Sequence, residues 1–330
     1  AQTARDWALA DTHFTKAATL EPTDGRSRLN ATVAKQWLTA EGGASYTSTE
    51  LHAGYRMAAR LLPDDDDPLR LLVGLYPNSL EHRVAALDEV IADNADAIWA
   101  RVWKAYLLRA TDAEAALDVL AEAERIAPDN AAIVVNRAET LAEMGRWTDA
   151  VDAYIQALTR GAPGSLGAAS DALDALIHLG AQSRDIDEAT RDRAYDALCA
   201  ANPAVGRYGN NAGLWYRDVG RDYEKSLRYY QKAVEAQPDD QDYINDTALI
   251  YLFHLRDRKE LCLPMFLKVR RLVEDEGQEP IRGYWDTLEN LCKYYFETGQ
   301  FEKVLECAAL RVDDRAQLNG KPYPSLRSAA

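Results

Sequence analysis

The chain has 330 residues, a formal net charge of -15 and a sequence pI near 4.9. Such an acidic chain lacks the clustered Lys and Arg that nucleic acid and anionic membrane surfaces require, so we expect neither as a partner. No segment approaches the roughly 20 consecutive apolar residues of a membrane-spanning helix, and the four cysteines form no Cys-x-x-Cys pair, so we expect no membrane insertion, no metal and no cofactor.

The N-terminal segment WALADTHFTKAATLEP predicts a helix that ends before Pro22. Ala10, Phe14 and Ala17 recur at intervals of four and three residues, which places them on one helix face. This pattern fits the second helix of a pair, so the first pair is incomplete. The chain begins AQTAR without Met. We therefore expect the bacterial cytoplasm or, if this end is the product of signal-peptide removal, an exported location such as the periplasm.

Two looser helix pairs are predicted over residues 25–63 and 64–96, with a turn at PDDDDP between them. Pairs that begin near Ala97 and Ala131 then show a periodic pattern in their second helices. A small, a large and a small residue recur in the same order: Ala116, Leu120 and Ala123 return as Ala150, Tyr154 and Ala157. Their spacing within each segment marks one packed face of a helix.

The next pair, between Ser165 and Val205, is predicted to be longer and irregular. It follows GAPGSLG at residues 161–167, which we interpret as a loop between repeats rather than a phosphate loop, because no strand precedes it. Pairs near Gly206, Gln241 and Trp285 follow, and the small–large–small face returns as Ser226, Tyr230 and Ala233.

Glycines are predicted to end several first helices in the left-handed conformation, namely Gly145, Gly220 and Gly299. Pro264 departs from the pattern in the second helix of its pair. The segment RDRKELCLPMFLKVRRLVEDEG, from Arg256, is locally basic and could bind an acidic partner or pair with acids of a neighbouring repeat.

These segments resemble the tetratricopeptide repeat, a helix–turn–helix unit of about 34 residues. The interval from Ala116 to Ala150 matches that length. The resemblance covers nearly the whole chain and is strong for about half of it. It implies an all-α fold, a right-handed α-solenoid of about eight helix pairs over residues 1–314, the first of them incomplete. Residues 315–330 are expected to form a flexible or docked C-terminal tail.

The resemblance also implies a binding site, because the first helix of each such repeat projects side chains into a concave groove. The residues expected there are Arg101, Arg109, Asn136, Glu139, Glu143, Asn210, Asn211, Arg217, Asn245, Asp246, Leu249, Phe253, Asn290, Lys293 and Phe296. Asn136, Asn211, Asp246 and Asn290 all fall at the sixth position of their repeats. Amides there could satisfy the backbone of an extended peptide, or could stabilise their own repeat. A clamp for a terminal carboxylate is not expected, because Arg101 has no basic counterpart in the next repeat.

The leading hypothesis is a non-enzymatic scaffold that binds a peptide segment or protein surface in this groove. One alternative is an enzyme built on an α/α toroid with paired carboxylates, of the glycoside-processing type. The regular repeat spacing and the short connections argue against it. The other alternative is self-association through the end repeats, since an open stack leaves apolar end faces.

Overall fold

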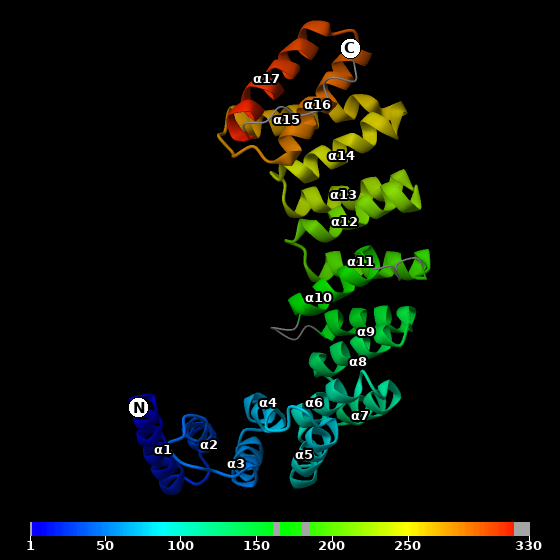
Figure 1. Ribbon diagram of the computed structural model, residues 1–330. Helices are drawn as coiled ribbons and strands as arrows, with labels where there is room; N and C mark the ends of the chain where they lie inside the picture. Colours follow the sequence, from blue (N-terminus) through cyan, green and yellow to red (C-terminus); the bar gives the residue numbers. More distant parts are fainter. Residues whose placement is uncertain (1, 161–165, 180–184, 320–330) are drawn as a thin grey trace. The chain divides into compact units, whose positions relative to one another are not determined.

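The computed structural model describes the backbone of residues 2–160, 166–179 and 185–319, and the side chains of residues 3–160, 166–178 and 185–310. These residues are helical throughout apart from turns and short connections, with no strand among them. The chain divides into two units, residues 1–171 and 172–330. Figure 1 labels the helices in chain order. The loop predicted at GAPGSLG lies largely outside the described residues, as does the turn at 180–184.

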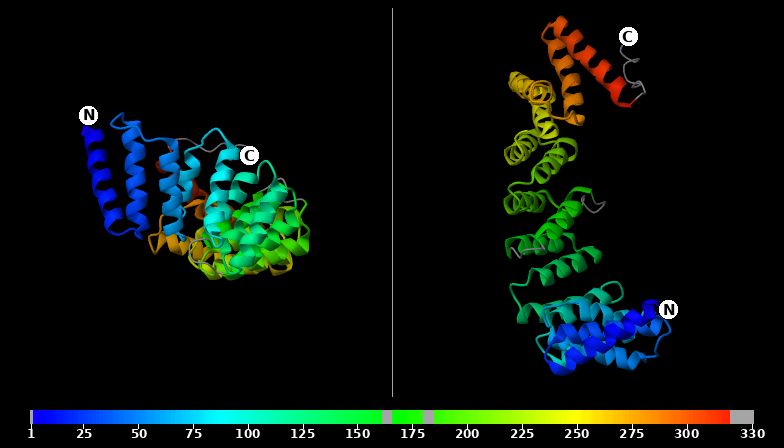
Figure 2. Two further views of the ribbon diagram at one scale, coloured as in Figure 1. Left: turned by 90° about the horizontal axis from the view of Figure 1, so that it is seen from below. Right: turned by 90° about the vertical axis from the view of Figure 1, so that its left-hand side faces the viewer.

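Unit 1 consists of successive antiparallel helices. They are α1 (Gln2–Leu20), α2 (Gly25–Ala40), α3 (Ser48–Leu61), α4 (Asp67–Gly74), α5 (Leu80–Asp93), α6 (Ile98–Leu108), α7 (Ala113–Ile126), α8 (Ala131–Glu143), α9 (Trp147–Arg160) and most of α10 (Leu166–Asp174). The left view of Figure 2 shows the blue helices α1, α2 and α3 side by side. Helix α1 packs against α2, and its assignment as the lone second helix of an incomplete pair stays a prediction.

Unit 2 continues the pairing with more irregular elements. They are the π-helical turn η1 (Ala175–Leu179), α11 (Glu188–Ala201), α12 (Gly206–Trp215), the π-helical turn η3 (Tyr216–Gly220), α13 (Tyr223–Ala236), α14 (Gln241–Phe253), the 3₁₀ turn η4 (Arg256–Leu261), α15 (Cys262–Glu274), α16 (Arg282–Glu297) and α17 (Phe301–Asn319). The first helices of consecutive pairs touch, α12 against α14 and α14 against α16.

Short polar side chains start many of these helices. Asp112, Asp222 and Asp240 each accept a hydrogen bond from a backbone N–H of the following first turn. Thr47 and Glu50 form a reciprocal capping box at the start of α3. These caps satisfy N–H groups that have no partner within the helix. The start of each of these helices is therefore determined by residues next to it in the sequence.

Two of the three predicted glycine stops are confirmed. Gly145 and Gly299 have φ of 75° and 72°, the left-handed conformation that ends α8 and α16. The prediction for Gly220 is wrong, because the left-handed residue there is Arg221, with φ of 57°. The π-helical turn η3 moves the stop by one residue. Gly220 instead allows a close approach, since a Cβ there would lie 2.8 Å from the ring of Trp215.

The predicted small–large–small positions form the packed interior between helices. Ala116, Leu120, Ala123, Ala150, Tyr154, Ala157, Ser226, Tyr230 and Ala233 are all buried. Because these helices contribute the same face, their pairs pack alike within each unit. Pro264 fits this scheme, since it lies in the first turn of α15, where its missing N–H would have no helical partner anyway.

The C-terminal helix is longer than expected. Helix α17 continues to Asn319, so it extends into the segment predicted as a tail from residue 315. The rest of that segment, residues 320–330, lies outside the described residues. The division of residues 1–314 into about eight repeats in one array stays a prediction. None of the described helices is long and apolar enough to span a membrane.

Candidate functional site

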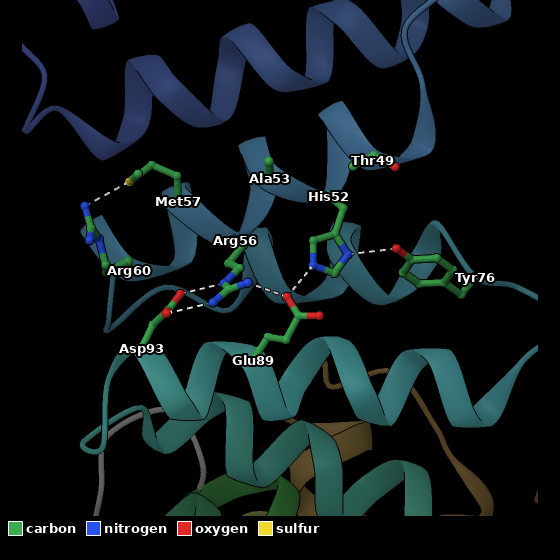
Figure 3. Close-up of a pocket in the computed structure, with 9 residues that line it drawn as sticks. All are labelled: Thr49, His52, Ala53, Arg56, Met57, Arg60, Tyr76, Glu89 and Asp93. Carbon is green, nitrogen blue, oxygen red and sulfur yellow. Dashed lines mark hydrogen bonds and ion pairs between the residues drawn. The ribbon is translucent and has the colours of Figure 1, made fainter.

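A cavity of about 550 Å³ lies between α3 and α5, the second helices of two neighbouring pairs (Figure 3). Arg56 of α3 donates two hydrogen bonds to Asp93 of α5, at 2.5 and 2.7 Å, and a further one to Glu89. His52 lies between the hydroxyl of Tyr76, at 2.7 Å, and the carboxylate of Glu89, at 3.1 Å. These polar groups therefore bind one another.

This network ties α3 to α5 rather than presenting free groups to a ligand. Arg60, at the end of the cavity, contacts the sulfur of Met57 at 3.1 Å. Nothing in the sequence pattern predicts this cavity, because its residues come from two second helices and a loop. It stabilises the packing of unit 1 and does not by itself indicate a function.

The predicted binding residues of unit 1 are largely engaged inside the chain. Arg101 is buried, donates to the carbonyl of Ala97 at 3.3 Å and lies 3.8 Å from Glu122. Asn136 donates to the carbonyl of Ala132, in its own helix, at 2.9 Å. The peptide contacts predicted for these two side chains stay predictions, and the structure shows the internal partners that a peptide would have to replace.

Arg109, Glu139 and Glu143 form one ion-paired group. The guanidinium of Arg109, the residue directly after α6, pairs with Glu139 and, at 2.9 Å, with Glu143 of α8. The pairing links the first helices of two neighbouring repeats. It also explains why acids occupy positions where a carboxylate clamp would need basic residues.

In unit 2, asparagines join neighbouring first helices. Asn290 of α16 donates to the side-chain oxygen of Asn245 of α14 at 3.0 Å, and Thr287 donates to the same oxygen at 3.1 Å. Asn211 of α12 donates to Asp174 at 2.8 Å. A sixth-position amide thus reaches back to an acceptor in the preceding repeat. These two amides therefore bind the preceding repeat, whereas the structural role that the sequence suggested was within their own repeat.

The series is interrupted at Asp246. Asn245 and Asn290 correspond to Asn210 and Asp246 one repeat earlier, but a carboxylate has no N–H to donate. Accordingly, Asn210 Oδ1 and Asp246 Oδ2 are both buried without a hydrogen-bond partner in the part of the chain that the structure describes. Two acceptors are therefore left where the neighbouring repeat has a donor and an acceptor.

Asp246 is 5% exposed, and burial raises the pKa of its carboxyl to about 6. The positive charges of Arg217 and Arg282 oppose this shift, and the negative charges of Asp242 and Asp286 add to it. The phenol of Tyr230, on α13, is also buried without a hydrogen-bond partner among the described residues. Burial raises the pKa of Tyr230, and the charge of Asp246 raises it further.

We call Asp242, Asp246, Asp286 and Arg282 the Asp246 cluster. Arg282 lies 3.7 Å from Asp242 and 3.7 Å from Asp286, too far for hydrogen bonds, and its side chain is 70% exposed. Arg217 beside the cluster binds Asp218 through two hydrogen bonds, at 2.6 and 2.9 Å. The sequence predicts Asp246 at this surface but not its companions, although Asp242 and Asp286 each lie one helical turn from a cluster member.

Aromatic and basic side chains lie farther along the same helices. The ammonium of Lys293 on α16 lies 4.2 Å from the centre of the Phe253 ring on α14. Phe296 is 65% exposed. We call the exposed sides of α12, α14 and α16 the first-helix surface of unit 2.

The basic segment from Arg256 is ion-paired within unit 2. Arg256 and Lys259 pair with Glu297, and Arg258 pairs with Glu224. Together, Lys259 and Arg256 lower the pKa of Glu297 to about 2 through hydrogen bonds to its carboxylate. Of the two possibilities that the sequence left open, pairing with neighbouring acids is the one that the structure shows.

Paired antiparallel helices with buried small–large–small faces, repeated along the chain, decide the fold. The chain has a tetratricopeptide-like fold. No family model and no curated protein matches its sequence.

Solved structures that resemble this tetratricopeptide-like chain share little of its sequence. The C-terminal part of a tetratricopeptide repeat protein from Cytophaga hutchinsonii is 12% identical, with a TM-score of 0.49, over 81% of this chain and 100% of that one. MamA from Desulfovibrio magneticus RS-1, from residue 41 to its end, is 24% identical, with a TM-score of 0.30, over 52% and 91%. YrrB, described as having an unusual peptide-binding site, is 16% identical, with a TM-score of 0.34, over 58% and 94%. With sequence identities and TM-scores this low, the functions of these proteins are not transferred to this chain.

Proposed function

We propose that the protein is a non-enzymatic binding protein that holds a segment of a partner protein on the first-helix surface of unit 2. The observation that carries this proposal is the pair of buried acceptors on α12 and α14 without partners among the described residues, Asn210 Oδ1 and Asp246 Oδ2. Each such atom costs about 1–3 kcal/mol in a folded protein. In the next repeat, the acceptor of Asn245 that corresponds to Asn210 Oδ1 is satisfied by the amide of Asn290.

The same surface offers groups that suit a polypeptide partner. Phe296 is an exposed aromatic side chain, the type that most often anchors protein interfaces. Lys293 and Phe253 form a cation–π pair beside it, so an apolar side chain of the partner would have both a flat ring and an aliphatic stem to contact. Aromatic groups and unsatisfied acceptors on the same helices fit an extended segment with alternating apolar and polar side chains.

The proposal is tested by the affinity for a partner obtained from an extract of the source cells. The change is Phe296→Ala, which removes the exposed ring without touching a buried group. Its matched control is Leu261→Ala, because Leu261 is also apolar and exposed but lies on η4. We expect at least a tenfold loss of affinity for Phe296→Ala and none for Leu261→Ala.

Equal affinities of both variants and the wild type would overturn the assignment of the surface. Alanine at Asn211 and Asn290 would be a poorer test, because both side chains bind neighbouring helices and their loss would disturb the fold. A strictly monomeric protein with no partner in any extract would overturn the proposed function itself.

A further inference from the structure

Helix α17, the last helix labelled in Figure 1, is apolar on two faces. Val304, Cys307 and Leu310 lie on the inner face and pack against the core of unit 2. Phe301 and Leu305 lie one turn apart on another face, where they are 60% and 72% exposed. We call these two residues the exposed face of α17. In the part of the chain that the structure describes, this apolar face is left largely uncovered.

The same two positions recur in α13, inside unit 2. Arg221 and Gly299 are both left-handed, with φ of 57° and 72°, and each precedes the start of a second helix by two residues. Tyr223 follows Arg221 by two residues, and Leu227 follows it by six. The two residues of the exposed face of α17 follow Gly299 at the same distances. Tyr223 and Leu227 are therefore their inner counterparts.

Both inner counterparts are covered by the next first helix, α14. The ring of Tyr223 stacks on that of His254, directly after α14, with the ring centroids 4.0 Å apart. Leu227 is 5% exposed and belongs to the same core cluster as Ile244 and Ala248, which lie one turn apart on α14. An amphipathic helix therefore occupies this position on α13, and the same position on α17 is open.

The exposed face of α17 adjoins the first-helix surface of unit 2. The ring of Phe296, on α16, meets that of Phe301 edge to face, with the ring centroids 5.9 Å apart. Phe296 is the exposed aromatic anchor of the proposed binding surface. A partner that contacts Phe296 therefore lies next to the exposed face of α17.

A second copy of the chain suits this face less well than a different protein does. Glu302 and Glu306 lie one turn apart along one edge of the face, and both are exposed. Glu306 pairs with Arg270 at 3.2 Å. In a symmetric antiparallel pair of α17 helices centred on this face, the two acids would lie opposite the same acids of the other copy, and like charges repel. A different protein can place Lys or Arg there instead.

We propose that the partner packs an amphipathic helix on the exposed face of α17, as α14 packs on α13. This inference rests on the proposed function, and it names the structure of a second part of the partner, beside the segment on the first-helix surface. The helix presents apolar side chains one turn apart to Phe301 and Leu305, and a Lys or Arg to Glu302. Burial of the two apolar side chains provides the driving force.

The inference is tested with a displayed library of short helix-forming peptides, randomised at surface positions and selected on the intact protein. The variant is Leu305→Ser, which removes an apolar group from an exposed position and so leaves the core intact. The matched control is Leu267→Ser, because Leu267 is an exposed leucine on α15, another second helix of the same unit. Circular dichroism establishes that both variants are folded.

We expect the wild type and Leu267→Ser to select peptides whose apolar residues recur at intervals of four and three, on one helix face. Leu305→Ser should bind a selected synthetic peptide more than tenfold more weakly than the wild type does. A proline at the centre of that peptide should weaken its binding to the wild type by a similar factor, because proline breaks the helix.

The possible failures are distinguishable. Equal binding of the selected peptide to Leu305→Ser and the wild type, or selection of no helical peptide, would overturn the inference. The proposed function would still stand, because Phe296→Ala tests it against the natural partner. A wild-type dimer in analytical ultracentrifugation that Leu305→Ser abolishes would assign the face to a second copy and overturn the inference. Peptide binding more than tenfold tighter to a chain that ends at Asn319 would overturn it in favour of residues 320–330.

Discussion

Replacing Asp246 with Asn should stabilise the protein at neutral pH. Burial raises the pKa of this carboxyl from 3.8 to about 6, so the native state disfavours its ionised form. A difference of that size corresponds to roughly 3 kcal/mol at pH values where the group is ionised in both states. Asn also brings an N–H that can reach Asn210 Oδ1, as Asn290 reaches Asn245. We expect a gain of about 1–3 kcal/mol in the free energy of unfolding.

The direction of the pH dependence follows from the same pKa difference. Between about pH 4 and pH 6 the native state binds the proton of Asp246 more tightly than the unfolded state does. The wild type therefore loses stability as the pH rises through this window, and the penalty is fully present above it. The charged and titratable groups that act on Asp246 or respond to it are Asp242 on its own helix, Arg217 on η3, Tyr230 on α13, and Arg282 and Asp286 on α16. Asp246→Asn leaves all of them in place, so the difference between the two proteins isolates Asp246.

Urea denaturation of the wild type, Asp246→Asn and the control Asp257→Asn at pH 7.5 and pH 4.0 measures this difference. Asp246→Asn should exceed the wild type at pH 7.5 and come within about 1 kcal/mol of it at pH 4.0, while Asp257→Asn follows the wild type at both. A variant less stable than the wild type at pH 7.5 would refute the reasoning. It would mean that the carboxylate has a favourable partner that outweighs its burial. A gain of equal size at both pH values would assign the effect to the new amide alone.

Three further substitutions test the packing. Gly209→Ala should lower the free energy of unfolding by about 1–3 kcal/mol, because the new Cβ would lie 2.8 Å from a backbone oxygen of α13. The control Gly74→Ala, where no atom lies within 4 Å of the new Cβ, should lower it by less than about 1 kcal/mol. Urea denaturation compares the two variants. Arg56→Met should cost about 1 kcal/mol at low salt and less in 1 M salt, whereas Arg60→Met should change stability by only a few tenths of a kcal/mol. Arg191→Leu should destabilise the protein by about 2–4 kcal/mol, because the fully buried guanidinium donates to backbone carbonyls and stacks 4.2 Å from the centre of an indole ring. An unchanged midpoint for Arg191→Leu would contradict that assignment.

Much of the fold could be predicted because the signals for its helices lie in short segments of the sequence and recur along the chain. Ala116 and Ala150 hold the same place in the second helices of two successive pairs, and both are buried. The caps, such as Asp112 before α7, need only their own first turn. Local signals of this kind do not depend on how distant segments meet. They failed at Gly220, where a π-helical turn shifts the stop by one residue and no periodic pattern records it.

The candidate site was less predictable because hydrogen bonds between repeats depend on the register of neighbouring helices. The sequence placed Asn245 and Asn290 on one face but left open whether they serve a ligand or the fold. Only the contact of α14 with α16 shows that one donates to the other. The approach of Arg282 to Asp242, at 3.7 Å, needed the same information, since the two residues lie on different helices, α16 and α14.

The charged residues between α3 and α5 and those around Asp246 differ in how far they are paired, and the comparison supports the proposed function. Between α3 and α5, Arg56 binds two carboxylates and His52 contacts two partners. The charged groups there are therefore paired with one another and hold the two helices together. In unit 2, a carboxylate of lower exposure has a buried oxygen without a partner among the described residues, at a position where two other repeats carry an engaged asparagine. The chain is thus able to satisfy such groups and does not do so at Asp246. The unsatisfied oxygen is unfavourable for folding, and this supports the proposed binding surface on unit 2.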